Sequence, residues 1–415
     1  MPAEEIDRAT MRQNGAAPDT EHESWLGVLA IFLRLGLTSF GGPVAHLGYF
    51  RSEFVERRAW LDEKAYVDII ALCQFLPGPA SSQVGITLGI LRAGLPGAFA
   101  AWIGFTAPSA IAMIAFGYGV ATLGNIGDAA WLHGLKIVAV AVVAQAVWGM
   151  ARNLTPDRAR VSLALAAALL ALAVPGSLGQ IGAIIAGGLI GWRLLPGGDG
   201  PGATEIAVTI ARPVAIAALV LFALALFGLP LIAAASHGHA IALFDSFYRS
   251  GALVFGGGHV VLPLLQNAVV PPGWIDNDAF LAGYGAAQAM PGPLFTFAAY
   301  LGTVMHPAPD GIAGGLLCLV AIYLPSFLLL IGVLPFWDAL RRRADVQSAL
   351  KGVNAAVVGL LLAALYRPVW TSAIFAPADF ALGLTAFVVL VFWRVPPWLV
   401  VVLGALGATG LGWLA

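Results

Sequence analysis

The chain has 415 residues, of which 60% are hydrophobic and only 10% are charged, and its formal net charge is −1. Ordinary globular proteins carry about 25% charged residues, so this composition excludes a soluble fold. The near-neutral charge gives no electrostatic basis for binding nucleic acid. Several apolar runs are long enough to cross a hydrocarbon core, which takes about 20 helical residues, and they do not alternate as barrel strands would. The composition therefore predicts an all-α polytopic membrane protein.

Four regions follow one another along the chain. Residues 1–24 form a polar tail rich in Asp and Glu, which differs from a signal peptide because it has no basic start and no apolar core. Residues 25–195 and 240–415 are two copies of one unit. Residues 196–239 hold a Gly/Pro linker and one connecting transmembrane helix, an apolar run at Val214–Ala235 without a counterpart in either copy.

The internal repeat is visible as pairs of motifs at a nearly constant offset. Matching elements are Phe32-Leu33-Arg34-Leu35-Gly36 with Phe247-Tyr248-Arg249-Ser250-Gly251, Phe40-Gly41-Gly42 with Phe255-Gly256-Gly257, and Gln74-Phe75-Leu76-Pro77-Gly78-Pro79 with Gln288-Ala289-Met290-Pro291-Gly292-Pro293. Val174-Pro175 also matches Val395-Pro396, and Gly191-Trp192 matches Gly412-Trp413, near the ends of both copies. The repeat therefore covers nearly the whole chain.

The distribution of positive charge predicts that the two copies have inverted topology. Cytoplasmic loops collect Lys and Arg. Residues 51–64 are basic whereas their counterpart at about 266–279 has no basic residue, and residues 121–130 have none whereas 341–351 are basic. The acidic residues interleaved with the basic ones in 51–64 predict a solvated amphipathic face.

The fold we expect is two inverted-topology repeats with broken or re-entrant helices and about 10–13 membrane segments. Residues 65–91 are broken at Pro77-Gly78-Pro79. The segment either dips into the membrane and returns, or crosses it with a different assignment of the first helix.

Two kinds of helix break recur in both copies, and both suit an anion site. Glycine removes the side chain and frees backbone amides, which points to Gly41, Gly42, Gly256 and Gly257. Proline favours the first helical turn, so Pro79 and Pro293, which follow Pro77 and Pro291, are expected to start half-helices whose first turns hold Ser81, Ser82 and Thr296. The N-terminus of a half-helix offers free N–H groups and a positive dipole end. The alternative is that these motifs only kink helices and allow close packing.

Arg34 and Arg249 are repeat equivalents within apolar stretches. Ionisable groups inside membrane segments are costly and usually functional. Two guanidinium groups could orient a divalent oxyanion through bidentate hydrogen bonds. The alternative is that each arginine reaches the membrane interface from near a helix end.

Other polar residues are candidates for the same site. Lys136 could bind an anion or carry a proton, or could lie at the interface. His46 and His259 follow the glycine motifs and are candidate proton carriers, although a hydrogen-bonded structural role is the alternative. Gln74 and Gln288 precede the two Pro-Gly-Pro breaks and could donate to an oxygen ligand.

The sequence lacks the motifs of several other protein classes. Cys73 and Cys318 have no Cys or His neighbours at metal-ligand spacing, which predicts neither a metal site nor a required disulfide. We find no hydrolase constellation, Walker loop, redox motif or haem-ligand pattern, so we expect no cofactor and no enzymatic activity. A membrane enzyme or a structural protein would not explain arginines at matched positions in apolar segments.

The paired glycine and Pro-Gly-Pro motifs resemble the signatures of the chromate ion transporter (CHR) family, in order and in spacing. Gly258 stands in the second copy where the first has Pro43. The resemblance implies a long-chain, two-domain member in the bacterial inner membrane that exports chromate, driven by the proton motive force, and so confers resistance. A sulfate-type oxyanion carrier or an anion channel of the same fold is the alternative. The expected partners are chromate or a sulfate-like oxyanion, protons and the lipid bilayer, and a homodimer is permitted but not required.

Overall fold

A computed structural model of the chain describes residues 23–122, 130–197, 210–236 and 238–414. Every regular element in these residues is helical, and none of them forms a strand. Five helical segments are long and apolar enough to cross a membrane: Ala80–Ala121, Ala130–Leu154, Arg212–Ser236, Gly311–Arg341 and Ala344–Trp370. The prediction of an all-α polytopic membrane protein is therefore confirmed.

The first half of the chain contains seven α-helices between its described ends. They are α2 (Trp25–Thr38), α3 (Gly42–Arg51), α4 (Glu63–Phe75), α5 (Ala80–Thr122), α6 (Ala130–Leu154), α7 (Arg158–Ala173) and α8 (Ser177–Leu194). A π-helical turn at Ser52–Arg57 extends α3. Helix α5 is broken at Ala93 and Gly94, where Gly94 has a φ of +60°.

The second half contains one additional helix, α9, and nine further α-helices among its described residues. These are α9 (Arg212–Ser236), α10 (His239–Ala252), α11 (Val261–Val269), α12 (Asn277–Ala287), α13 (Phe297–Val304), α14 (Gly311–Val333), α15 (Trp337–Arg341), α16 (Ala344–Ala364), α17 (Pro377–Val391) and α18 (Pro397–Leu414). The additional helix, α9, covers the apolar run that we expected to connect the copies. Only 11% of its most apolar window is buried, so α9 lies against the outside of the bundle.

Three of the helices that flank the Pro-Gly-Pro breaks are short. Helix α4 has 13 residues, α12 has 11 and α13 has 8. At about 1.5 Å per residue these helices are at most about 20 Å long, whereas a hydrocarbon core is about 30 Å thick. None of the three can cross a membrane alone, which supports the re-entrant alternative for these segments.

The two halves interlock through their last two helices. The hairpin α17–α18 of the second half packs on α6 of the first, and the hairpin α7–α8 of the first half packs on α16 of the second. Small residues allow both contacts, because a Cβ atom on Gly134 of α6 would overlap α18 at Gly404, and one on Gly352 of α16 would overlap α8 at Gly187. Each half therefore completes the surface of the other.

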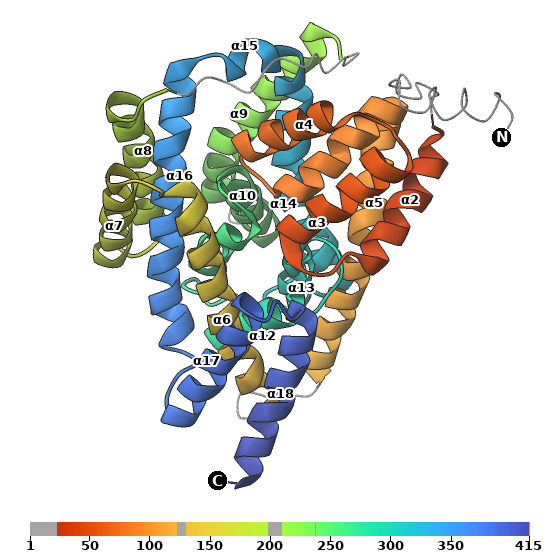
Figure 1. Cartoon of the computed structure of the whole chain (residues 1–415). Helices are drawn as coiled ribbons and strands as arrows, with labels where there is room; N and C mark the ends of the chain where they lie inside the picture. The colour runs from red at the N-terminus through yellow and green to blue at the C-terminus, as the bar shows by residue number, and fades with distance from the viewer. Residues whose placement is uncertain (1–22, 123–129, 198–209, 237, 415) are drawn as a thin grey trace, which may run out of the picture.

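Corresponding turns of the two halves lie at opposite ends of the molecule. The C-terminal end of α5 and the N-terminal end of α6 lie at the bottom of Figure 1, whereas α15, which has the corresponding place in the second half, lies at the top. Helices α4 and α15 share the top end, since Asp68 of α4 pairs with Arg341 of α15. This arrangement supports inverted topology and places the basic segments 51–64 and 341–351 at one end. Of the stretch 121–130 that lacks basic residues, residues 123–129 lie outside the described part of the chain.

Candidate functional site

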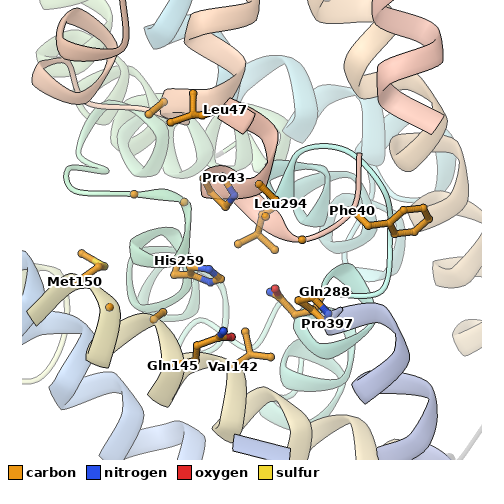
Figure 2. Close-up of a pocket in the computed structure, with 18 of the residues that line it drawn as sticks. Phe40, Pro43, Leu47, Val142, Gln145, Met150, His259, Gln288, Leu294 and Pro397 are labelled. Atoms are coloured by element: carbon orange, nitrogen blue, oxygen red, sulfur yellow. The ribbon is translucent and has the colours of Figure 1, made fainter. Parts of the chain in front are cut away.

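A cavity of about 1150 Å³ lies where the two halves meet. Its wall includes both glycine motifs, one residue of each Pro-Gly-Pro break, and parts of α6, α16 and the α17–α18 turn. Figure 2 shows side chains from both halves around this space. The elements that the sequence singles out as helix breaks are thus the elements that line the cavity.

Five helical segments begin at the cavity wall. The first residues of α3, α5, the turn before α11, the turn before α13, and α18 all line the cavity, and they are Gly42, Ala80, Gly258, Leu294 and Pro397. The N-terminus of a helix carries a partial positive charge and N–H groups without partners in the helix. Several such ends around one space favour an anion at its centre.

The described part of the cavity wall carries a positive side-chain charge and no negative one. Arg394, in the turn between α17 and α18, is the one fully charged side chain among the described lining residues, and no Asp or Glu lines the cavity there. Uncharged polar groups supply the other hydrogen-bonding capacity, from Tyr49, Gln74, Gln145, Asn153, His259, Gln288 and Asn354. Because no carboxylate would repel an anion, the wall suits negative ligands.

The two Pro-Gly-Pro breaks are each held by the other half of the chain. The Gly78 amide donates to the carbonyl oxygen of Val254 at 2.6 Å, and the Gly292 amide donates to that of Ser39 at 2.8 Å. Both glycines have positive φ, +127° and +90°, a region in which other residues are strained. A Cβ atom on Gly78 would also lie 2.5 Å from Ser326 Oγ. These two amides therefore fix the breaks, and other amides of the wall are left for a ligand.

A polar chain borders the cavity on the side of the second half. His259 Nδ1 lies 2.8 Å from the Tyr284 hydroxyl, and the nearby Gln288 Nε2 is buried without a hydrogen-bond partner among the described residues. His259, Gln288 and Gln145 point toward the same space in Figure 2. Since the imidazole is held by Tyr284 through one nitrogen, its ring has a fixed orientation at the wall.

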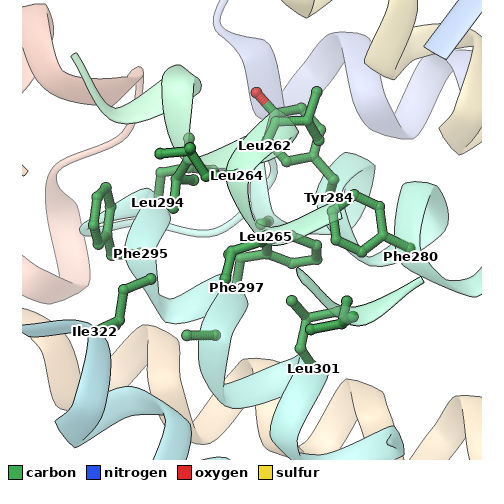
Figure 3. Packing of buried hydrophobic residues seen from close by; sticks show 14 of the residues in the cluster. Leu262, Leu264, Leu265, Phe280, Tyr284, Leu294, Phe295, Phe297, Leu301 and Ile322 are labelled. Carbon is green, nitrogen blue, oxygen red and sulfur yellow. The ribbon is translucent and has the colours of Figure 1, made fainter. Parts of the chain in front are cut away.

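A close-packed apolar core lies behind His259, Tyr284 and Gln288. Phe297 contacts Phe280 edge to face at 5.1 Å between ring centroids, and Tyr284 at 5.7 Å. Figure 3 shows these rings with Leu265 and Leu301 between the short helices. The packing fixes α12 and α13, and with them the second Pro-Gly-Pro break.

Seven of the residues predicted for the site line the cavity together. They are Gly41, Gly42, Gly256, Gly257, Gln74, Gln288 and His259. The prolines Pro77, Pro79, Pro291 and Pro293 do not line it, but they flank lining glycines, and α5 and the turn before α13 begin directly after Pro79 and Pro293. The role of all these residues in binding stays a prediction.

The hydroxyl groups of the first turns face the protein interior. Ser81, Ser82 and Thr296 lie in first turns as expected, yet they are buried and do not line the cavity. Ser82 Oγ lies 3.4 Å from the Tyr323 hydroxyl, and Thr296 donates to the Pro293 carbonyl at 2.9 Å. Their hydrogen bonds are thus made within the protein.

His46 occupies a buried position between two helix breaks. Its Nδ1 lies 3.3 Å from Ser81 Oγ, its Nε2 lies 3.2 Å from the Ser39 carbonyl oxygen, and its ring packs edge to face on Phe105. His46 does not line the cavity. Both ring nitrogens have hydrogen-bond partners, which agrees with the structural role that was the alternative to proton transfer for His46.

The structure does not bring Arg34 and Arg249 together. Neither lines the cavity, and each pairs at 2.7 Å with a carboxylate of its own half, Arg34 with Glu53 and Arg249 with Asp245. Both carboxylate side chains are only 5% exposed. In this arrangement each guanidinium neutralises a buried acid, and a role in substrate binding stays a prediction.

Glu53 differs from the solvated face that we expected for residues 51–64. Its buried carboxylate accepts hydrogen bonds from Arg34, Arg57 and Arg58. Desolvation by burial raises the pKa of Glu53, but the hydrogen bonds from Arg57 and Arg58, with the charge of Arg34, outweigh it and hold the pKa below its ordinary value. The prediction of a solvated face is wrong for Glu53, because three arginines compensate its burial.

Lys136 is also outside the cavity. It is buried in α6, and its Nζ lies 3.2 Å from Asp278 Oδ1 of α12, so it joins the first half to the second. This pairing satisfies the charge inside the bundle, and the proposed anion-binding role of Lys136 stays a prediction.

Five polar residues of the wall were missed by the sequence analysis: Tyr49, Gln145, Asn153, Asn354 and Arg394. Gln145 interrupts an apolar stretch of α6 and Asn354 directly precedes the apolar stretch of α16, and this pattern could have identified them. Arg394 stands in a short turn, and no local pattern distinguishes it from an arginine at the membrane interface.

Comparison with known families adds an independent finding. A family model described as "Chromate transporter" matches the chain twice, over residues 26–192 and 241–409. Both matched segments hold one glycine motif and one Pro-Gly-Pro break of the cavity wall.

Individual relatives match over most of their length. A chromate transport protein of Pseudomonas aeruginosa is 31% identical over 346 residues, which is 81% of this chain and 79% of the relative. An uncharacterized transporter of Methanocaldococcus jannaschii is 26% identical over 83% of this chain and 84% of its own. A chromate transport protein of Cupriavidus metallidurans is 25% identical over 80% of each chain. No solved structure matches the chain.

Proposed function

Because this chain belongs to the chromate transporter family, we propose that it is a secondary transporter that exports chromate across the inner membrane of a bacterium. The proton motive force drives export in this proposal, and export confers chromate resistance. The protein carries out no enzymatic step. The observation that carries the proposal is a cavity between the halves that is lined by helix N-termini and by no described carboxylate.

The chemistry of the cavity agrees with a divalent oxyanion as cargo. Backbone amides of the glycine motifs and the side chains of Gln74 and Gln288 can donate hydrogen bonds to tetrahedral oxygens. The partial positive charges at five helix starts stabilise negative charge. His259 at the wall is the candidate to carry a coupled proton, since imidazole changes charge near neutral pH.

Movement of one half against the other provides alternating access in this proposal. The cavity lies at the interface of two halves with corresponding elements, as in carriers built from inverted repeats. The reciprocal bonds at Gly78 and Gly292 join the breaks across this interface, so both breaks are expected to shift together.

A carboxylate placed in the cavity tests whether its charge selects the ion. At a separation of about 5 Å and an effective dielectric constant of about 20, two unit negative charges repel by about 3 kcal/mol. We therefore expect Gln288→Glu to reduce chromate transport by roughly 100-fold or more at neutral pH, while Gln288→Met, which removes a hydrogen-bond donor without adding a negative charge, reduces it by a smaller factor. The measurement is chromate uptake into everted membrane vesicles, energised and then treated with a protonophore.

Controls separate the cavity from the arginine pair. Arg34 lies outside the cavity, so a normally inserted Arg34→Gln variant is expected to transport chromate. Equal transport by Gln288→Glu and the wild type would contradict the cavity as the binding site. No chromate transport by well-inserted wild-type protein, with transport of sulfate instead, would favour the sulfate carrier, and an anion current that persists after proton equilibration would favour the channel.

A further inference from the structure

The turn between α17 and α18 places an arginine at the cavity wall. Arg394 follows the end of α17 and lies three residues before Pro397, where α18 begins. Both Pro397 and Arg394 line the cavity. The positive end of the α18 dipole and a full positive charge thus border the same part of the wall.

Arg394 has a backbone conformation that non-glycine residues seldom adopt. Its φ is +54°, and Ala59 is the one other non-glycine residue with positive φ in the described chain. The left-handed region costs an L-residue about 1–2 kcal/mol. The Val395 amide donates to the Val389 carbonyl at 3.2 Å, which folds the turn back on α17. The turn therefore holds Arg394 at one place on the wall.

The electrostatic setting of Arg394 differs from that of the arginines that pair with buried carboxylates. Arg34, Arg249 and Arg341 each pair with a buried carboxylate. Arg394 is exposed and forms no ion pair with any described residue. Its guanidinium is thus available to a ligand in the cavity, and no acidic side chain of the described wall competes for it.

We propose that Arg394 is the residue by which the cavity selects divalent over monovalent oxyanions. The inference rests on the proposed transport function and assigns to one side chain the full positive charge of the site. A planar guanidinium matches two oxygens of a tetrahedral dianion through parallel N–H···O bonds. Backbone amides at the helix starts then supply the remaining hydrogen bonds to the ion. Their partial charges stabilise monoanions and dianions alike.

The test compares anions of different charge on purified wild-type protein and on two variants. We expect Arg394→Gln to weaken chromate and sulfate binding by about 10- to 100-fold, the usual effect of losing a charge-assisted hydrogen bond. Binding of the monoanions perrhenate and nitrate is expected to change by a smaller factor. Arg394→Lys keeps the charge without the bidentate geometry and is expected to restore part of the dianion affinity. Binding is measured by calorimetry in detergent, and transport is measured as flux into proteoliposomes.

Arg342→Gln is the matched control, because Arg342 is exposed in the turn after α15 and does not line the cavity. Equal losses for dianions and monoanions in Arg394→Gln, or no loss, would overturn the selectivity role while leaving the transport proposal intact. If Arg394 instead contacts a lipid phosphate, Arg394→Gln would change the flux only in proteoliposomes that contain anionic lipid. Anion binding in detergent would then be unchanged, which would also overturn the selectivity role. Wild-type protein that binds none of these oxyanions would instead contradict the proposed function itself.

Discussion

Replacing Arg341 by methionine is expected to lower the free energy of unfolding by about 3–5 kcal/mol, the usual cost of leaving a buried charge without its partner. Arg341 and Asp68 are 2% and 3% exposed, and their Nη1 and Oδ2 atoms lie 3.0 Å apart. The pair joins α15 of the second half to α4 of the first. Asp338 also contacts Arg341 but is half exposed, so its charge can return to water when the arginine is lost. The measurement is thermal unfolding of the purified protein in detergent.

A double variant separates loss of the ion pair from loss of packing. With Asp68→Leu added to Arg341→Met, no charge of the pair remains buried, and most of the stability is expected to return. Arg342→Met, at an exposed neighbouring position, serves as the control and is expected to be nearly neutral. If the single and double variants unfold at the same temperature, the charge of Asp68 is not the cause and the explanation fails.

Gly352→Leu is expected to prevent the stable packing of α16 on α8. A Cβ atom at Gly352 would overlap the Gly187 carbonyl oxygen and lie 2.7 Å from Gly191 Cα. Backbone atoms cannot move aside as the end of a flexible side chain can, so we expect a loss of about 3 kcal/mol or more, at the upper end for overpacked cores. The measurement is the yield of monodisperse protein and its melting temperature.

Gly182→Leu provides the matched control on α8. Nothing lies within 4 Å of a Cβ atom at Gly182, so the same substitution is expected to leave the yield and the melting temperature nearly unchanged. A Gly352→Leu protein as stable as Gly182→Leu would show that the two helices do not pack this closely in the membrane. Since α16 also carries Asn354 to the cavity wall, milder changes at Gly352 are expected to affect transport as well.

The helix breaks could be predicted from sequence because their causes are local. Proline and glycine constrain the backbone wherever they stand, so Pro79 and Pro293 precede helix starts in the structure as the sequence indicated. The connecting helix at α9 was predicted for a similar reason, since its length and composition are properties of one segment. Inverted topology was predicted from the distribution of basic residues, which collect on the cytoplasmic side of a membrane, and it stays a prediction that the arrangement of the turns supports.

The placement of the arginines depended on tertiary contacts that no local pattern contains. Arg34 and Glu53 come from different elements, and the burial of Glu53 makes Arg34 its partner. In the sequence, Glu53 is one acid among several interleaved with basic residues, so its burial could not be recognised. Arg394 reaches the cavity because the α17–α18 hairpin packs on α6 of the other half, a contact between segments more than two hundred residues apart in the chain.

The exchange of hairpins between the halves has a consequence for how the protein is made. The hairpin α17–α18, which covers α6 and contributes to the cavity wall, is synthesised more than two hundred residues after α6. A nascent chain that has inserted only its first half therefore lacks this part of the wall. The cavity is expected to form only after both halves have entered the bilayer.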